Sequence, residues 1–220
     1  TGLVTSASRR TELLRWAGEA PDRYIIEDDY DSEFRFDAHP MAAMQSMDRS
    51  GRVIYMNTFS KSLSPAIRIS YMVLPPRLMD DFQEKLGFYG CTVPSFEQYT
   101  LARFLSEGYF EKHINRLRKL YKARRNRIIS ILENCPLSQR MTIEEQDAGL
   151  HFLLRVSTEL SDDALVQRCL DAGIRIQPLS SFYHGQAPKE FEHCLVVNYD
   201  CLSDEDLLRL SQRLDVLEIP

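Results

Sequence analysis

The pattern of apolar and polar positions predicts three short strands in the first third of the chain. Consecutive apolar residues occur within Tyr24–Glu27, Val53–Met56 and Ile69–Leu74. Such runs are typical of strands in a parallel sheet that is covered on both faces. A helix is expected before them, over Ser6–Glu19, because serines can cap its start and its apolar residues share one face. Asp37–Ser50 is expected to be a loop that contains a short helical turn.

Helical patterns dominate the middle of the chain. They cover Leu78–Phe88, Ser95–Glu107 and Glu111–Cys135. In the second of these we expect Ser95 to be the N-cap, because Gln98 follows three residues later. The third carries an apolar stripe made of Ile114, Leu117, Tyr121, Ile128 and Leu132. A helix of this length can join two domains.

Strands and helices alternate again after residue 136. Strands are expected at Leu150–Val156, Ile174–Gln177 and Leu195–Tyr199. One helix should run from Ser161 to near Gly173, and the last should open at a capping box in Ser203–Asp206 and end near Leu217.

The order of these elements predicts an α/β fold with a second, smaller domain. We expect a large, mainly parallel domain over residues 1–108, a connecting helix over 109–136, and a small α+β domain over 137–220. Three strands are few for the large domain. The first residues, Thr1–Thr5, contain neither an initiator methionine nor a signal-peptide pattern. The chain therefore looks like part of a longer protein.

Composition narrows the functional classes. Of 220 residues 44% are hydrophobic, and the net charge of −5 gives no overall reason to expect nucleic-acid binding. No apolar run approaches the ~20 residues of a membrane-spanning helix. The five cysteines form no CxxC pair, and their odd number favours a reducing, cytoplasmic location. The histidines lack metal-ligand spacing.

One helix is crowded with positive charge. Its basic residues are Arg116, Arg118, Lys119, Lys122, Arg124, Arg125 and Arg127. A DNA-contacting face is conceivable. We favour a solvated helix face, because the charges go round the helix, no aromatic platform accompanies them, and the acidic remainder of the chain offsets them.

Two charged residues stand at strand ends, where chemistry is expected. Asp28 and Lys61 each follow an apolar strand, so both should lie at the carboxyl edge of a parallel sheet, where open α/β folds bind ligands. The alternative is that Lys61 is a solvated loop lysine and Asp28 a turn residue.

The neighbours of these two residues suit a particular cofactor. Pyridoxal phosphate needs a lysine amine for a Schiff base, a carboxylate at its pyridine nitrogen, and hydroxyl and arginine groups at its phosphate. Arg68 offers a planar, permanently charged guanidinium. Thr58 and Ser60 offer hydroxyls, and Tyr30 a phenol.

Two long segments carry a family resemblance. EDDYDSEFRF at Glu27–Phe36 and TFSKSLSPAIRISY at Thr58–Tyr71 closely resemble the paired signatures of the MocR/GabR family. These bacterial GntR-type transcription regulators join an N-terminal winged helix-turn-helix to a fold-type I aminotransferase-like domain that binds pyridoxal phosphate. The resemblance extends over essentially the whole chain and implies that fold.

The resemblance also implies site roles. Lys61 would be the Schiff-base lysine, Asp28 the partner of the pyridine nitrogen, and Tyr30 the contact of the ring hydroxyl. Arg68 would bind the phosphate, helped by Thr58 and Ser60. Asp28 is preferred over Asp29 because the family pattern places the tyrosine two residues after the pyridine partner.

The chain departs from the family pattern in two ways. The DNA-binding domain and the first strands of the aminotransferase-like domain, which carry further cofactor contacts, are absent from it, so we expect weak or no cofactor binding by this chain alone. In addition, Val196 occupies the place of the arginine that binds a substrate carboxylate. The closest arginine in sequence, Arg175, is expected to point to solvent.

These expectations combine into one function. The chain is expected to be the effector-sensing region of such a regulator, with a small amino compound as effector, DNA bound only through an N-terminal domain, no membrane, and a homodimer at full length. A first alternative is a pyridoxal-phosphate-dependent aminotransferase. A second is an interaction domain that keeps the fold without the cofactor.

Overall fold

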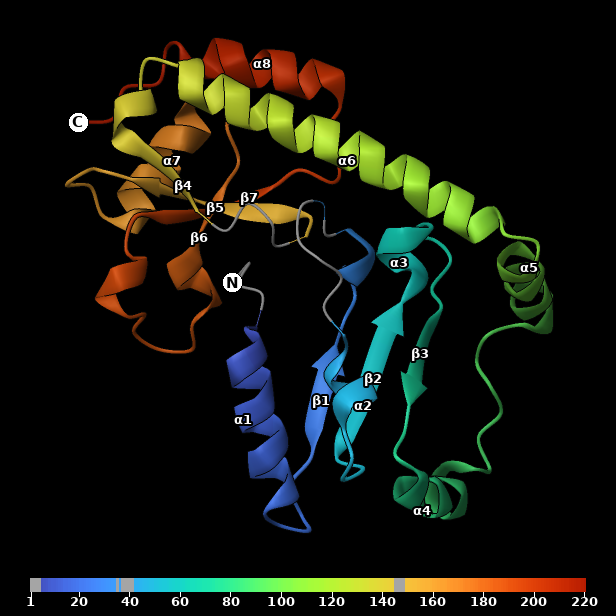
Figure 1. Cartoon of the computed structure of the whole chain (residues 1–220). Helices are drawn as coiled ribbons and strands as arrows, with labels where there is room; N and C mark the ends of the chain where they lie inside the picture. The colour runs from blue at the N-terminus through green and yellow to red at the C-terminus, as the bar shows by residue number, and fades with distance from the viewer. Residues whose placement is uncertain (1–4, 35, 37–41, 145–148) are drawn as a thin grey trace. The chain divides into compact units, whose positions relative to one another are not determined.

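The computed structural model describes residues 5–34, 36, 42–144 and 149–220, which fall into two compact units (Figure 1). The N-terminal unit takes in the described residues from 5 to 33 and from 42 to 116. The C-terminal unit takes in Phe34, Phe36 and the described residues from 117 onward. The division falls within the long helix α6 (Tyr109–Asn134).

The N-terminal unit is built on a mixed sheet with the order β1-β2-β3. Its strands are β1 (Ile25–Asp28), β2 (Val53–Thr58) and β3 (Ser70–Val73). The first two are parallel, as expected, but β3 is antiparallel to β2 and all four of its residues are exposed. The expectation of a covered parallel strand is therefore wrong for β3. The strand runs antiparallel because the connection over residues 59–69 is too short for the crossover that parallel strands require.

Four of the five helices of this unit overlap segments predicted to be helical, and the short helix after β2 was not predicted. They are α1 (Ala7–Gly18), α2 (Met44–Met47), α3 (Phe59–Ser62), α4 (Pro76–Leu86) and α5 (Ser95–Ser106), with a 3₁₀ turn at Ser32–Phe34. Ser6 caps α1 by accepting the N–H of Arg9 at 3.3 Å. The expected cap of α5 is wrong: Pro94 is the N-cap and no side chain caps the helix. Of the loop expected over 37–50, residues 37–41 lie outside the described part, and α2 supplies the short helical turn.

The C-terminal unit contains a second sheet, in which every pairing is antiparallel, with the order β4-β5-β7-β6. Its strands are β4 (Met141–Glu144), β5 (His151–Val156), β6 (Gln177–Pro178) and β7 (Cys194–Asn198). Its helices are α7 (Asp162–Asp171) and α8 (Asp204–Leu214), with 3₁₀ turns at Ser138–Arg140, Leu179–Phe182 and Lys189–Phe191. The caps expected at Ser161 and Ser203 are confirmed. The apolar pattern of the sequence did not predict β4, and it predicted a longer strand, Ile174–Gln177, where the structure has the two residues of β6.

The core of this unit lies between its sheet and its helices. Figure 1 shows α8 lying along the C-terminal part of α6. Ile128 and Leu132, from the predicted stripe of α6, are 0% and 5% exposed and pack in this core with Phe152 and Tyr199. The apolar stripe of α6 is thus confirmed in its buried positions.

The basic residues of α6 are only partly a solvated face. Arg124 donates to the carbonyl oxygen of Asp200 at 2.6 Å, and Arg127 pairs with Asp204 at 2.8 Å. Arg125 is 5% exposed, and its guanidinium lies over the ring of Phe36. These three arginines therefore make contacts within the C-terminal unit, of which those of Arg124 and Arg125 are the less exposed. In the part of the chain that the structure describes, no helix is both long and apolar enough to cross a membrane.

Candidate functional site

The parallel pair β1 and β2 brings the two key charged residues to one edge of the sheet. Asp28 is the last residue of β1 and pairs with Met56 of β2. The next backbone N–H, of Asp29, donates to the carbonyl oxygen of Met56 at 3.0 Å. Lys61 lies in α3, which begins directly after β2. Both residues therefore stand at the carboxyl ends of neighbouring parallel strands.

The side chain of Asp28 shares one face of the sheet with apolar residues. Paired residues in neighbouring strands point to the same face, so Asp28 lies with Ile26, Met56 and Met72. The exposed fractions of these apolar residues are 67%, 37% and 44%. Asp28 is itself exposed. Its carboxylate thus lies on the open face, where a ligand can reach it.

The opposite face gives the neighbouring Asp29 a different role. The Tyr55 hydroxyl donates to the Asp29 carboxylate at 3.1 Å, and the side-chain amide of Asn57 donates to the Tyr55 oxygen at 3.1 Å. Burial raises the pKa of Tyr55 well above its usual value, and the charge of Asp29 adds to this. Asp29 therefore orders the strand ends from the other face. This network was not predicted; its only signal in the sequence is the alternation of Tyr55 and Asn57 along the strand.

The turn around Lys61 is fixed by hydroxyl groups. Thr58 caps α3: its Oγ1 accepts the N–H of Ser60 at 3.2 Å and lies 2.9 Å from the Ser60 hydroxyl oxygen. Lys61 follows with an exposed side chain. The neighbouring Ser62 hydroxyl is buried and has no hydrogen-bond partner among the described residues.

Arg68 completes this turn in an unusual backbone conformation. Its φ is 52°, in the left-handed region that non-glycine residues seldom adopt. Its exposed guanidinium makes a single hydrogen bond with the described residues, a 3.5 Å contact to the carbonyl oxygen of Pro65. Its remaining donors are therefore available to an anion.

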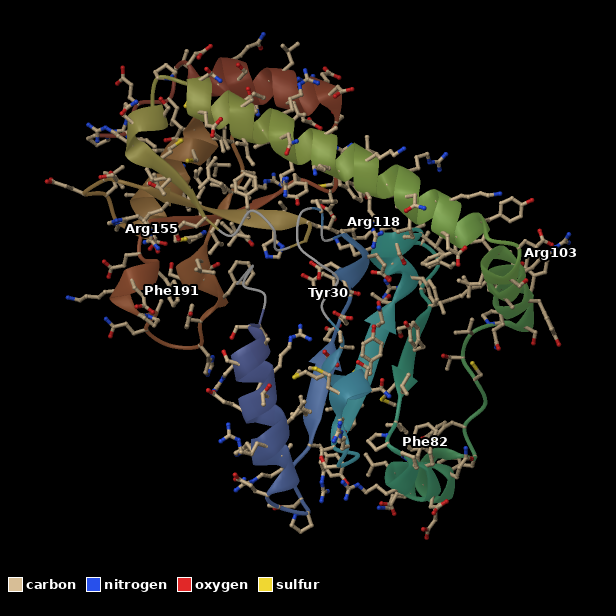
Figure 2. The ribbon with its side chains drawn as sticks, in the orientation of Figure 1. Tyr30, Phe82, Arg103, Arg118, Arg155 and Phe191 are labelled. Atoms are coloured by element: carbon tan, nitrogen blue, oxygen red, sulfur yellow. The ribbon has the colours of Figure 1, made fainter. Side chains whose placement is uncertain are left out.

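These groups fit the donor set that pyridoxal phosphate requires. An amine, two hydroxyls, a guanidinium and a carboxylate stand on segments that end or begin at one sheet edge, and an orphaned hydroxyl lies in the same turn. Tyr30, labelled in Figure 2, is 36% exposed in the turn after β1. Among the described residues, no cluster of three or more metal-ligating side chains occurs.

The place expected for a carboxylate-binding arginine is apolar. Val196 lies in β7, is 9% exposed, and packs with Leu153, Leu179 and Cys194. Arg175 is exposed, as the alternation predicted.

Nearly the whole chain matches a known family. The model of aminotransferase class I and II matches residues 1–214. The chain belongs to this family.

Similar proteins refine the assignment. The chain is 38% identical over 219 residues to the uncharacterized HTH-type transcriptional regulator YhdI of Bacillus subtilis, covering 100% of the chain and 46% of that protein. It is 42% identical over 184 residues to the probable rhizopine catabolism regulatory protein MocR of Rhizobium meliloti. That match covers 83% of this chain and 37% of MocR. The resemblance to MocR-type regulators is thereby confirmed. The chain spans less than half the length of these two relatives.

A solved structure confirms the fold. The kynurenine aminotransferase of Pyrococcus horikoshii superposes with a TM-score of 0.81 at 27% identity, covering 97% of this chain and 53% of that one. The fold-type I aminotransferase fold expected from the sequence is therefore correct.

Proposed function

We propose that this chain is the effector-sensing, pyridoxal-phosphate-binding region of a MocR/GntR-type transcription regulator. The observation that carries the proposal is the placement of Asp28 and Lys61 at the carboxyl ends of adjacent parallel strands. The similarity to HTH-type regulators supports the regulatory role. In the complete protein, DNA would be bound through an N-terminal domain, and the regulator would act as a homodimer.

Each residue of the edge has a proposed role. Lys61 is the point of covalent attachment, and Asp28 keeps a proton on the pyridine nitrogen. Arg68, Thr58 and Ser60 bind the phosphate, and Tyr30 donates to the ring hydroxyl. When bound, the cofactor supplies an electron-accepting ring and an electrophilic carbon for amines.

The sensing step rests on competition for that carbon. A small amino compound that takes the place of Lys61 leaves the lysine ε-amine free within the turn. Lys61 lies in a turn that is fixed by the Thr58 cap and strained at Arg68. A change in the charge and contacts of Lys61 would therefore shift the balance between two conformations of this turn. Such a switch needs only a difference in affinity for two states, and no turnover.

Covalent trapping tests the proposal. The purified protein is incubated with pyridoxal phosphate, reduced with borohydride, and digested for peptide mass spectrometry. Lys61 should be labelled at cofactor concentrations far below those that label Lys85, an exposed lysine of α4. Because trapping accumulates product, weak binding is sufficient. Equal labelling of the two lysines would refute the site and favour an interaction domain without cofactor.

A second candidate function is an aminotransferase, which the similarity to kynurenine aminotransferase supports. The apolar surroundings of Val196 count against recognition of an ordinary amino acid there, because no guanidinium is among the described residues that pack with it. Amino-group transfer from a panel of amino compounds to 2-oxo acids separates the two. Sustained turnover would favour the enzyme, and a spectral change without turnover would favour the sensor.

A further inference from the structure

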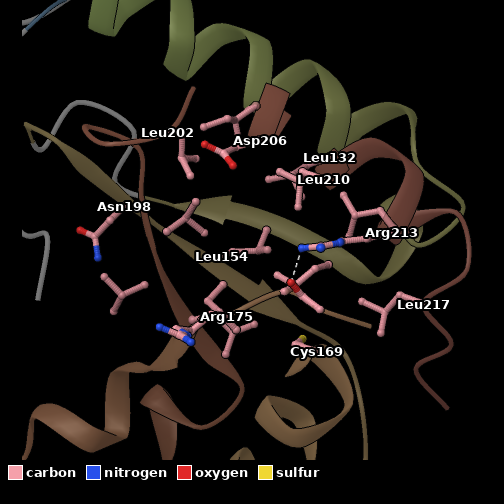
Figure 3. A pocket seen from close by; sticks show the side chains of 18 of the residues that line it. Leu132, Leu154, Cys169, Arg175, Asn198, Leu202, Asp206, Leu210, Arg213 and Leu217 are labelled. Carbon is pink, nitrogen blue, oxygen red and sulfur yellow. Dashed lines mark hydrogen bonds between the residues drawn. The ribbon is translucent and has the colours of Figure 1, made fainter. Parts of the chain in front are cut away.

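The C-terminal unit contains a cavity of about 460 Å³ beneath α8. Its walls come from α6, β5, β7 and α8 and from the chain's last residues, and Figure 3 shows Leu132, Leu154, Leu210 and Leu217 around it. Protein interiors normally contain few voids larger than a water molecule. Cavities of this size and apolar character are typical of small-molecule sites.

An arginine of α8 reaches across this cavity. Arg213 donates from Nη1 to the carbonyl oxygen of Gly173. Gly173 has a φ of +78°, and a Cβ atom there would lie 2.9 Å from the Arg213 guanidinium carbon. The positive φ favours glycine here, and a side chain at this position would push the guanidinium away. Arg213 is held in place, while its other donors have no partner among the described residues.

A second arginine stands at another side of the cavity. Arg175 makes no hydrogen bond or ion pair with the described residues, and Figure 3 shows it apart from Arg213. The carboxylate of Asp206 also lines the cavity, but it accepts the N–H and the hydroxyl of Ser203 at 2.8 and 2.6 Å. Arg209, another lining residue, pairs with Glu205. The charged groups of the rim that lack a counterion among the described residues are therefore Arg175 and Arg213, and Asn198 and Gln177 add neutral polar side chains.

We propose that this cavity binds an organic carboxylate with an apolar body. The carboxylate would accept from Arg175, since a guanidinium matches its planar geometry, Arg213 would add positive charge from another side, and the aliphatic or aromatic body would fill the leucine-lined chamber. Every group of this site belongs to the C-terminal unit, whereas Asp28 and Lys61 belong to the other. The site is thus a second ligand site, and its test does not depend on pyridoxal phosphate.

Three probes of equal chain length separate charge from hydrophobicity. Octanoate, octanol and octylamine are titrated below their micelle concentrations, at constant ionic strength, by calorimetry. Octanoate should bind at least tenfold more tightly than octanol, and octylamine should not bind. Octyl phosphate tests whether the rim accepts phosphate as well. Equal affinity for octanoate and octanol would overturn the arginine contact.

Substitutions test the same assignment. Arg175→Gln should weaken octanoate binding about tenfold while leaving the fold intact, because Arg175 has no partner to lose. Arg168→Gln, which removes an exposed arginine of α7 outside the cavity, should have no effect. Leu210→Trp should fill the chamber and abolish binding, with circular dichroism as the check on folding. An unchanged affinity in Arg175→Gln would refute the proposal.

Two exposed cysteines give an independent readout. Cys201 lines the cavity, and Cys91 lies in the other unit. Octanoate should slow alkylation of Cys201 by iodoacetamide several-fold and leave the rate at Cys91 unchanged. Equal rates at Cys201 with and without octanoate would place any bound octanoate elsewhere and overturn the assignment.

Discussion

The guanidinium of Arg10 lies 3.4 Å from the carboxylate of Glu27, and both side chains are buried. This ion pair ties α1 to β1. Glu27 also accepts the backbone N–H groups of Met44 and Gln45 at 2.8 and 3.0 Å, so one carboxylate connects α1, β1 and the start of α2. The strand that ends in Asp28 is thereby fixed to its covering helix.

Removing the cation of this pair should destabilise the N-terminal unit strongly. Arg10→Met leaves the Glu27 charge buried without its counterion, which costs about 3–5 kcal/mol. The measurement is urea unfolding followed by fluorescence of Trp16, the single tryptophan, which lies in α1. Arg9→Met is the matched control, because Arg9 and its partner Glu12 are exposed and such pairs contribute about 0–1 kcal/mol. Similar effects of the two substitutions would contradict the buried-pair argument.

Acid should weaken the same unit through Asp48. Burial alone would raise the pKa of Asp48, but hydrogen bonds from the N–H groups of Val53, Arg52 and Ser50 and from the Ser50 hydroxyl hold it below its usual value. The stabilisation is therefore present above the unfolded pKa of about 3.9 and is lost as the pH falls through the lower folded value.

Asp48→Asn should lower stability at neutral pH by roughly 2 kcal/mol, because it removes the acceptor of two backbone N–H groups. Its stability should also depend less on pH below about 4 than that of the unmodified protein. Asp80→Asn, at an exposed position of α4, is the control. A parallel pH dependence in both variants would argue against Asp48 as the titrating group.

High pH should lower the stability of the folded protein through ionisation of Tyr55. Because the folded pKa is raised, its contribution to stability is present below the unfolded value of about 10 and is lost as the pH rises toward the folded value. Tyr55→Phe should cost about 1–2 kcal/mol at pH 7, since it leaves the Asn57 amide without its acceptor. It should also flatten the fall in Tm above pH 10. Tyr99→Phe, at a residue 77% exposed, should leave both unchanged.

Local signals in the sequence predicted most of the elements, and contacts between distant residues decided what they missed. Ser6 and Ser203 could be recognised as caps because capping joins residues three positions apart. The direction of β3 could not, because consecutive apolar residues look the same in a covered parallel strand and in an exposed antiparallel one. The register shows the direction, because Tyr55 pairs with Val73 and Thr58 with Ser70, so the two strands run in opposite directions.

The candidate site was predictable to the same degree. Asp28 and Lys61 follow apolar runs, so their common edge could be inferred from a parallel pair. Nothing in the sequence separated the roles of Asp28 and Asp29 except the family pattern. The separation comes from the pleat, which turns Asp29 toward Tyr55, twenty-six positions away. The cavity beneath α8 was invisible for a similar reason, because Arg175 and Arg213 meet it only through the fold.

Arg68 should lower the stability of the folded protein through its strained backbone and, at the same time, strengthen anion binding through its guanidinium. A non-glycine residue at a φ of 52° carries a backbone strain of about 1–3 kcal/mol. Arg68→Gly relieves that strain at the expense of a more flexible unfolded chain, so the net gain should be roughly 1 kcal/mol by Trp16 fluorescence in urea. If Arg68 binds the cofactor phosphate, the same substitution removes a charge-assisted hydrogen bond of about 1.5–3 kcal/mol. The pyridoxal phosphate concentration needed to trap Lys61 should then rise tenfold or more.

Arg68→Lys separates these two effects. Lysine keeps the positive charge and the strained backbone but lacks the planar fork of donors. Its stability should stay within about 0.5 kcal/mol of the unmodified protein, because a surface substitution that keeps the backbone unchanged has little effect. Its cofactor requirement should fall between those of the unmodified protein and Arg68→Gly. If Arg68→Gly gains stability but Lys61 is trapped at the original concentration, Arg68 is a strained turn residue and the phosphate is bound by Thr58 and Ser60 without it.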